Sequence, residues 1–198
     1  MAVVNVLDKI TEWVQTNVCA EIKLKMPPDD EQAATDAGYD YKLITPQAFP
    51  LFVPAKDKTP PGVLSNFPSV CVRFLEGEEL PNRGEGSINI QLCFSTWDTG
   101  IHKQDVLKTA NDRDPVSPFQ RSGEGWRDAW NFVDIALRKL GNSLTVGGFE
   151  IDRETPIKYG PLTEQGEIIE DYPLWFAWAS FSVKYPIRRN VKEINDFL

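Results

Sequence analysis

The sequence predicts an α+β fold, in which an antiparallel β-sheet carries two main helices packed on one face. Two segments repeat apolar residues at the three- and four-residue spacing of a helix, and several others alternate apolar and polar residues as strands do. Along the chain these segments follow one another as helix, strands, helix, strands, an order that favours helices segregated on one side of a sheet. With 198 residues, we expect a single domain over residues 1–198.

The first helix is expected at residues 5–18. Val6, Ile10, Trp13 and Val14 share one of its faces, and the opposite face is polar. This pattern is typical of an amphipathic helix that packs one side on a sheet.

The second helix carries the stronger signal and ends at Gly141-Asn142, a common helix stop. Its apolar positions are spaced by four and three residues. They are Trp126, Trp130, Val133, Leu137 and Leu140, with Ala129 and Ala136 beside them. We expect this face to be buried against the sheet.

Six segments have the composition or the alternation of β-strands. They are residues 39–45, 49–53, 69–76, 87–97, 149–159 and 174–185. The last is apolar on both faces over its first half. This predicts either a central strand covered on each side, or a strand whose outer face meets another subunit.

The remaining segments are rich in proline, glycine or charge, and the chain has 15 prolines. We expect long loops or extended arms at about residues 26–40, 54–68, 76–86 and 98–122, and a C-terminal tail at 186–198. The long charged connection at 76–86 predicts a hairpin with a protruding arm. The acidic stretch at 26–40 is interpreted as solvated charge rather than as a metal site.

Composition excludes several classes of function. The formal net charge of −8 argues against nucleic-acid binding through phosphate contacts. No apolar run is long enough for a membrane span, and the start of the sequence does not have the pattern of a signal peptide. The one histidine, His102, excludes a multi-histidine metal site. We expect no cofactor and no metal.

Cysteine usage indicates thiols in a reducing compartment, because Cys19, Cys71 and Cys93 are an odd number and form no C-x-x-C pair. A bridge between Cys71 and Cys93 would be possible only if their strands pair.

The search for catalytic motifs yields little. His102 lies near Asp98 in sequence and could act as a base if a nucleophile such as Ser95 were close. Glu150 and Asp152 would share a strand face, a placement that suits acid–base chemistry, but an exposed polar face explains them better. A small hydrolase or ligand-binding domain that uses His102 is therefore kept as an alternative, and a non-enzymatic protein is the main expectation.

The sequence has many residues of the types found in protein–protein contacts and few that suggest catalysis. It has six tryptophans, an aromatic final strand, proline-stiffened arms and an apolar tail that follows a basic cluster. Aromatic residues and arginine are enriched in protein interfaces. The candidate subunit-interface residues are Trp175, Phe176, Trp178, Arg188, Arg189 and Phe197.

The order of several motifs resembles a known family. The motifs are FVPAK (52–56), PSVCVRF (68–74), INIQLCF (88–94), GEGWRDAWN (123–131), LRKL (137–140), GFEI (148–151) and YPLWFA (172–177). This order is similar to that of small structural proteins from the tail-assembly region of tailed phages and prophages, which include tail terminators and minor tail proteins. The resemblance covers most of the chain and contains no catalytic signature.

The resemblance implies a non-enzymatic ring protein, commonly a hexamer, located in the virion tail after assembly in the host cytoplasm. A tail terminator caps the tail tube, stops its elongation and joins it to the head connector. Its implied partners are other copies of itself, the tail tube protein and head–tail connector proteins. A head–tail connector or another minor tail protein is the alternative within the same class. No binding residue is carried over by motif.

Overall fold

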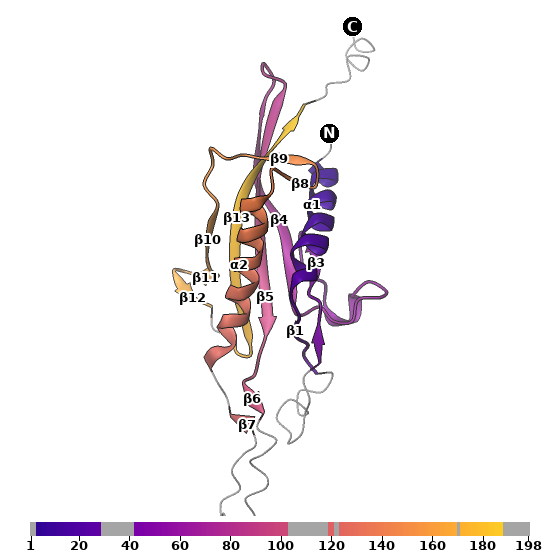
Figure 1. Ribbon diagram of the computed structural model, residues 1–198, viewed down its shortest axis with the longest axis vertical. Coiled ribbons are helices and arrows are strands. Elements are labelled where there is room, and N and C mark those ends of the chain that lie inside the picture. Colours follow the sequence, from indigo (N-terminus) through magenta and orange to yellow (C-terminus); the bar gives the residue numbers. More distant parts are fainter. Residues whose placement is uncertain (1–2, 29–41, 103–118, 121–122, 170, 188–198) are drawn as a thin grey trace, which may run out of the picture.

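The structure is a computed structural model that describes residues 3–28, 42–102, 119–120, 123–169 and 171–187. Its two long helices are α1 (Val3–Asn17) and α2 (Trp126–Asn142). The strands of the main sheet are β3 (Gln47–Pro50), β4 (Ser69–Leu80), β5 (Glu85–Trp97), β8 (Thr145–Val146), β9 (Phe149–Ile151), β10 (Lys158–Pro161) and β13 (Leu174–Pro186). Both helices cover the same face of this sheet (Figure 1), so the predicted α+β class is confirmed.

Shorter elements complete the described part of the chain. Three two-stranded ribbons are formed by β1 (Leu24–Lys25) with β2 (Leu43–Ile44), β6 (Ile101–His102) with β7 (Phe119–Gln120), and β11 (Thr163–Glu164) with β12 (Glu167–Ile168). Three 3-10 turns are η1 (Cys19–Glu21), η3 (Lys56–Lys58) and η5 (Gly123–Gly125). Of the predicted arms, 54–68 is described in full and contains η3, whereas residues 29–41, 103–118 and 121–122 lie outside the description.

The core lies between the helices and one face of the sheet. The alternation of β5 directs Ile88, Ile90, Leu92 and Phe94 toward the helices, and all four are buried. The ring of Phe94 meets that of Phe132 from α2 edge to face, with the ring centres 4.9 Å apart. On α1 the buried residues include Val6, Ile10 and Val14, so the apolar face predicted for this helix is confirmed.

The buried face of α2 differs from the predicted one. Its buried residues are Ala129, Phe132, Val133, Ala136 and Leu140. Trp126 is 43% exposed, and Trp130 is only partly buried. The prediction was wrong for Trp126 because it followed the largest apolar side chains. The two alanines let the helix axis approach the sheet, and Phe132 fills the space beside them.

β13 is the central strand. One edge pairs with β5 over its whole length, and the other pairs first with β10 and then with β9. The single strand predicted at 149–159 is therefore wrong, because the chain supplies two strands that pair with different parts of β13. The sheet is mainly antiparallel, as predicted, but the β3–β4 pair is parallel and makes it mixed.

The segment predicted as a charged connection at 76–86 is a β-hairpin. β4 continues to Leu80 and β5 begins at Glu85, with these two residues paired in register. The pairing shifts between Phe74 and Glu76, and Gly84 adopts a φ of 67° in the turn, a conformation that favours glycine. Figure 1 shows the hairpin projecting at the top, beyond the helices. The expected protruding arm is present, but it consists of paired strands.

A side chain of α1 closes the edge of the sheet at β3. The backbone N–H of Ala48 donates to Gln15 Oε1 at 2.7 Å, and Gln15 Nε2 donates to the carbonyl oxygen of Pro46 at 3.2 Å. Gln15 thus occupies the hydrogen-bonding positions that a further strand would use, which protects this edge from pairing with another chain.

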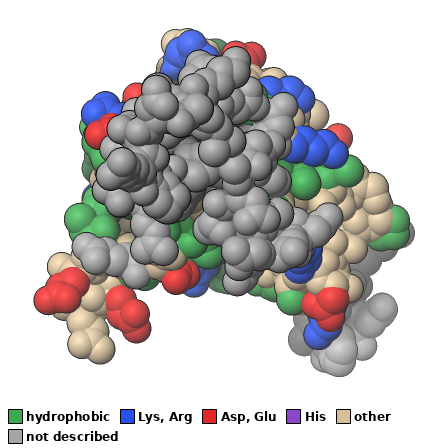
Figure 2. Space-filling model, turned by 90° about the horizontal axis from the view of Figure 1, so that it is seen from below, with side chains coloured by type: hydrophobic (Ala, Val, Ile, Leu, Met, Phe, Trp, Pro, Cys, Tyr) green, Lys and Arg blue, Asp and Glu red, His purple; other side chains and the backbone are tan. Residues whose placement is uncertain are grey.

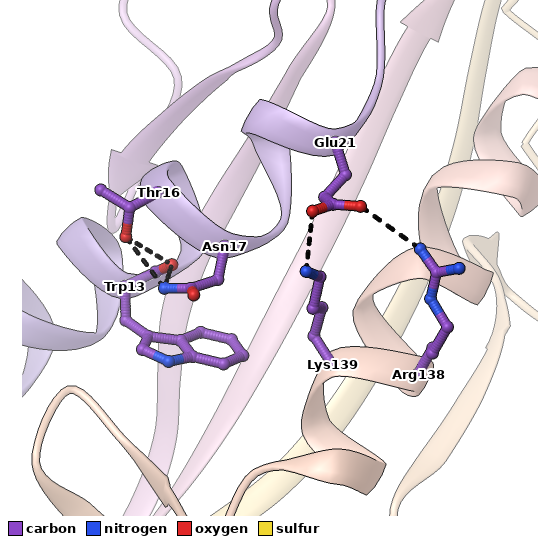
Figure 3. Close-up of polar contacts among 6 residues, drawn as sticks. All are labelled: Trp13, Thr16, Asn17, Glu21, Arg138 and Lys139. Carbon is purple, nitrogen blue, oxygen red and sulfur yellow. Dashed lines mark hydrogen bonds and ion pairs between the residues drawn. The ribbon is translucent and has the colours of Figure 1, made fainter.

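An ion-pair cluster ties the turn after α1 to the last turns of α2 (Figure 3). Lys139 Nζ lies 2.8 Å from Glu21 Oε1, and Arg138 Nη2 lies 3.6 Å from Glu21 Oε2. The hydrogen bond from Lys139 is the main reason why the pKa of Glu21 is lowered from its ordinary value. The cluster is exposed, so it orients the two helix ends more than it stabilises the fold.

Candidate functional site: a candidate subunit interface

The structure divides the predicted interface residues among different surroundings. Trp175 lies on the helix side of β13. Its Nε1 donates to the carbonyl oxygen of Asp98 at 3.1 Å, and its indole lies so close to Gly125 that a Cβ there would be 2.2 Å from Nε1. Tyr172 packs edge to face against it, with the ring centres 6.3 Å apart. Trp175 therefore packs the start of α2 onto the end of β5 within its own chain.

Trp178 and Phe176 lie on the opposite face of the sheet, and both are half-buried. Trp178 Nε1 donates to the carbonyl oxygen of Pro161 at 2.8 Å, and its ring covers Gly160, where a Cβ would meet it at 3.3 Å. Trp178 thus fastens β10 to β13, and this aromatic pair leaves part of its surface on the open side of the sheet.

The other predicted interface residues, Arg188, Arg189 and Phe197, lie outside the described residues. The segment that carries them begins beside the hairpin, because the N–H of Ile187 donates to the carbonyl oxygen of Gly84 at 2.8 Å. For His102 the structure describes only the backbone, which pairs with Phe119 in the β6–β7 ribbon. The use of His102 in catalysis or ligand binding stays a prediction.

Cys71 and Cys93 are direct neighbours across β4 and β5, as a bridge would require, but both are free thiols, as is Cys19. Burial raises the pKa of Cys71 to about 12 and that of Cys19 to about 12. The thiolate is the reactive form of cysteine, so these thiols are poor nucleophiles. The expectation of reduced thiols agrees with this arrangement.

Two carboxylates, those of Asp98 and Asp152, make structural contacts. Asp98, buried at the end of β5, accepts hydrogen bonds from Lys25 Nζ at 2.7 Å and from the N–H of Gly100 at 2.9 Å. Asp152 accepts a 2.9 Å contact from Lys184 Nζ, and this hydrogen bond is the main reason why the pKa of Asp152 is lowered. These pairs anchor β1 to β5 and the chain after β9 to β13.

The arms were predicted as contact surfaces, but their exposed apolar residues were not among the predicted interface residues. Apolar side chains between 39% and 70% exposed occur on two projecting segments. The hairpin carries Phe74, Leu75 and Leu80, and the loop between β3 and β4 carries Leu51, Phe52 and Leu64. The sequence does show apolar residues within these charged or proline-rich stretches, but the choice of interface residues was based mainly on the tryptophans.

These two segments project at different places. The hairpin lies at the top of Figure 1, and the β3–β4 loop emerges to the right in the lower half. Seen from below, hydrophobic side chains appear at both the left-hand and the right-hand edge, and the loop projects toward the right (Figure 2). Exposed apolar patches of this kind are typical of protein interaction sites.

The hairpin also has a free strand edge. β3 runs beside β4 only as far as Val72, which accepts a hydrogen bond from the N–H of Leu51 at 2.9 Å. Beyond that point, no strand of the described chain pairs with the outer edge of β4 over residues 73–80. This edge offers backbone N–H and C=O groups for pairing, and its exposed side chains include Glu76, Glu78 and Glu79.

The described residues contain no group of three histidine, cysteine or acidic side chains arranged to hold a metal ion. None of their helices has the length and apolar character needed to cross a membrane. Compared with known proteins, the chain matches no protein-family model and no curated protein sequence.

Proposed function

We propose that this protein is a non-enzymatic virion assembly protein, a phage tail terminator whose copies form a ring. The ring caps the tail tube, stops its elongation and joins the tube to the head connector. The proposal is supported by the resemblance of motif order described above and by a surface built for contacts.

The observation that carries the proposal is the pair of projecting segments with exposed apolar side chains. A closed ring is built from heterologous contacts, in which two different patches of each subunit meet. The hairpin and the β3–β4 loop give one chain two separate segments with exposed apolar side chains, so different contacts can be made at different places on each subunit.

The proposed partners follow from this role. Neighbouring copies share the ring contacts, the tail tube protein meets one side of the ring and head–tail connector proteins meet the other. The protein would be located in the virion tail after assembly in the host cytoplasm. A head–tail connector or another minor tail protein is the alternative that the same surface would serve.

Electron microscopy of particles assembled without this protein tests the proposal. A terminator leaves overlong or headless tails, and supplying the wild-type protein restores tails of uniform length. Tails of normal length that fail to join heads would favour the connector alternative. Normal tails with heads attached would contradict both roles.

A further inference from the structure

We propose that the free edge of β4 in one copy binds residues 188–198 of a neighbouring copy. The inference rests on the proposed function, because it requires a second copy, and it names the contact that joins the copies. The binding edge comprises residues 73–80, whose exposed apolar side chains are Phe74, Leu75 and Leu80.

The chemistry of the two segments is complementary. The edge carries exposed Glu76, Glu78 and Glu79 against one exposed basic residue, Arg73. The segment 188–198 begins with two arginines and continues with apolar residues at wider spacing. Its charged residues are Arg188, Arg189, Lys192, Glu193 and Asp196, with the two arginines placed first, and its apolar residues are Val191, Ile194, Phe197 and Leu198. Opposite charges would steer and orient the contact, and the apolar side chains would supply buried area.

The positions of the two segments favour a neighbour as the source. In the projecting part, the sheet order places β4 on one side and β13 on the other, with β5 between them. Ile187 is held beside Gly84 at the hairpin turn, so the segment starts at the level of this edge but on the far side. In a ring whose axis is parallel to these strands, rotation about the axis relates one copy to the next. Equivalent residues of neighbouring copies therefore lie at the same height along the axis. The segment of one copy then faces the β4 edge of the next.

The lengths also agree. Fully extended, residues 188–198 could span about 36–40 Å, whereas the edge from residue 73 to residue 80 is about 23 Å long. The segment can therefore bridge a gap between subunits and still cover the edge. Because β13 runs toward the hairpin turn, the segment has to turn back to lie along either edge, and it reaches its own β4 edge only by also crossing its own hairpin turn.

Charge-reversal variants of the full chain, measured by native mass spectrometry over a concentration series, test the inference. The hairpin variant is Glu76→Lys with Glu78→Lys, and the tail variant is Arg188→Glu with Arg189→Glu. Each alone should raise the concentration needed for assembly about tenfold or more, as should deletion of residues 188–198. The variant that combines all four changes should recover assembly, because the charges are again opposite.

Mixing distinguishes a neighbour's segment from the chain's own. In an equimolar mixture of hairpin and tail variants, each hairpin finds an oppositely charged segment on the other variant, so mixed oligomers should form. The matched control is Glu164→Lys with Glu167→Lys on the exposed β11–β12 ribbon, which has the same charge change and should assemble normally.

Three outcomes would overturn the inference. Normal assembly by the hairpin variant and by the deletion would do so while leaving the proposed ring intact. Recovery by the combined variant without recovery in the mixture would show that each chain binds its own segment. A wild-type chain that remains monomeric at every concentration would contradict both the inference and the ring.

Discussion

At the scale of single residues, most of the tryptophans make contacts within their own chain. Trp97 is buried, Trp13, Trp130 and Trp175 pack against the core, and Trp178 bonds to the backbone of β10. Trp126 is 43% exposed, and further exposed apolar side chains are phenylalanines and leucines on the arms. Residue type alone could not separate these cases, because burial depends on which helix face meets the sheet.

The difference between the predicted and the observed buried face of α2 leads to a prediction about stability. Phe132→Ala should lower the free energy of unfolding by about 3–5 kcal/mol, because Phe132 is fully buried against Phe94. Trp126→Ala should cost less than about 1 kcal/mol, since the ring is largely exposed and its notable contact is Arg127, 4.9 Å from the ring centre. Urea denaturation measures both. A larger loss for Trp126→Ala would contradict the observed helix face.

Asp128 gives a prediction with a pH dependence. Burial is the main reason why its pKa is raised, and the nearby charge of Asp98 adds to the effect. A folded-state pKa above the unfolded one means that the ionised form is disfavoured by folding. Stability from this group is present below the unfolded pKa and lost as pH rises through the folded pKa.

Asp128→Asn should therefore raise the melting temperature near pH 7, by about 1–3 °C, and the gain should vanish at low pH, where the wild-type carboxyl is also neutral. Thermal melts from pH 3 to pH 7 measure this difference. An equal gain at all pH values, or a loss at pH 7, would show that the carboxylate is not disfavoured in the fold.

At the scale of elements, the hairpin explains why part of the fold escaped prediction. Strands are recognised by a buried apolar face, but β4 beyond Val72 is exposed on both faces. Its run of glutamates resembles a loop, although the backbone pairs with β5 up to Leu80. Likewise, β9 and β10 read as one alternating strand, because sequence alternation does not show which part of β13 each residue meets.

The cap on β3 predicts a local effect. Gln15→Ala should lower the free energy of unfolding by about 1–2 kcal/mol, because it removes both hydrogen bonds to the strand edge. Hydrogen exchange at the Ala48 amide should accelerate more than exchange elsewhere. Glu12→Ala, an exposed change on the same helix, is the control and should leave the Ala48 amide protected. Unchanged exchange in Gln15→Ala would show that the cap does not close the edge.

Gly86 links the hairpin to β13. A Cβ at this position would lie 2.5 Å from Cζ of Tyr185, a buried residue whose hydroxyl lies 3.4 Å from Glu79 Oε1. Gly86→Ala should therefore displace the Tyr185 ring and destabilise the fold by about 1–3 kcal/mol, measured by urea denaturation. Gly141→Ala in α2, where nothing lies near the new Cβ, should instead stabilise by up to about 1 kcal/mol. Equal effects at the two sites would argue against the packing at Gly86.

At the scale of the whole molecule, the α+β class and the helix-covered sheet follow from periodicity, because the core-facing residues of α1 and β5 keep the expected spacing. The parallel pairing of β3 with β4 could not be predicted from periodicity. The relative direction of two strands depends on the path of the loop that connects them, here the proline-rich loop between β3 and β4. The subunit interface stays a prediction. Phe176 and Trp178, which the sequence indicated, are partly exposed. The free edge of the hairpin could not be predicted, because it depends on which strands pair in the folded sheet.

The central claim is that identical copies of this chain join head to tail into a closed ring. Cryo-electron microscopy of the purified full chain, alone and with tail tubes, tests it most directly. The account predicts rings of one subunit number, free in solution or seated on tube ends, with each projecting hairpin in contact with the adjacent subunit. A chain that stays strictly monomeric and leaves tube ends bare would contradict it.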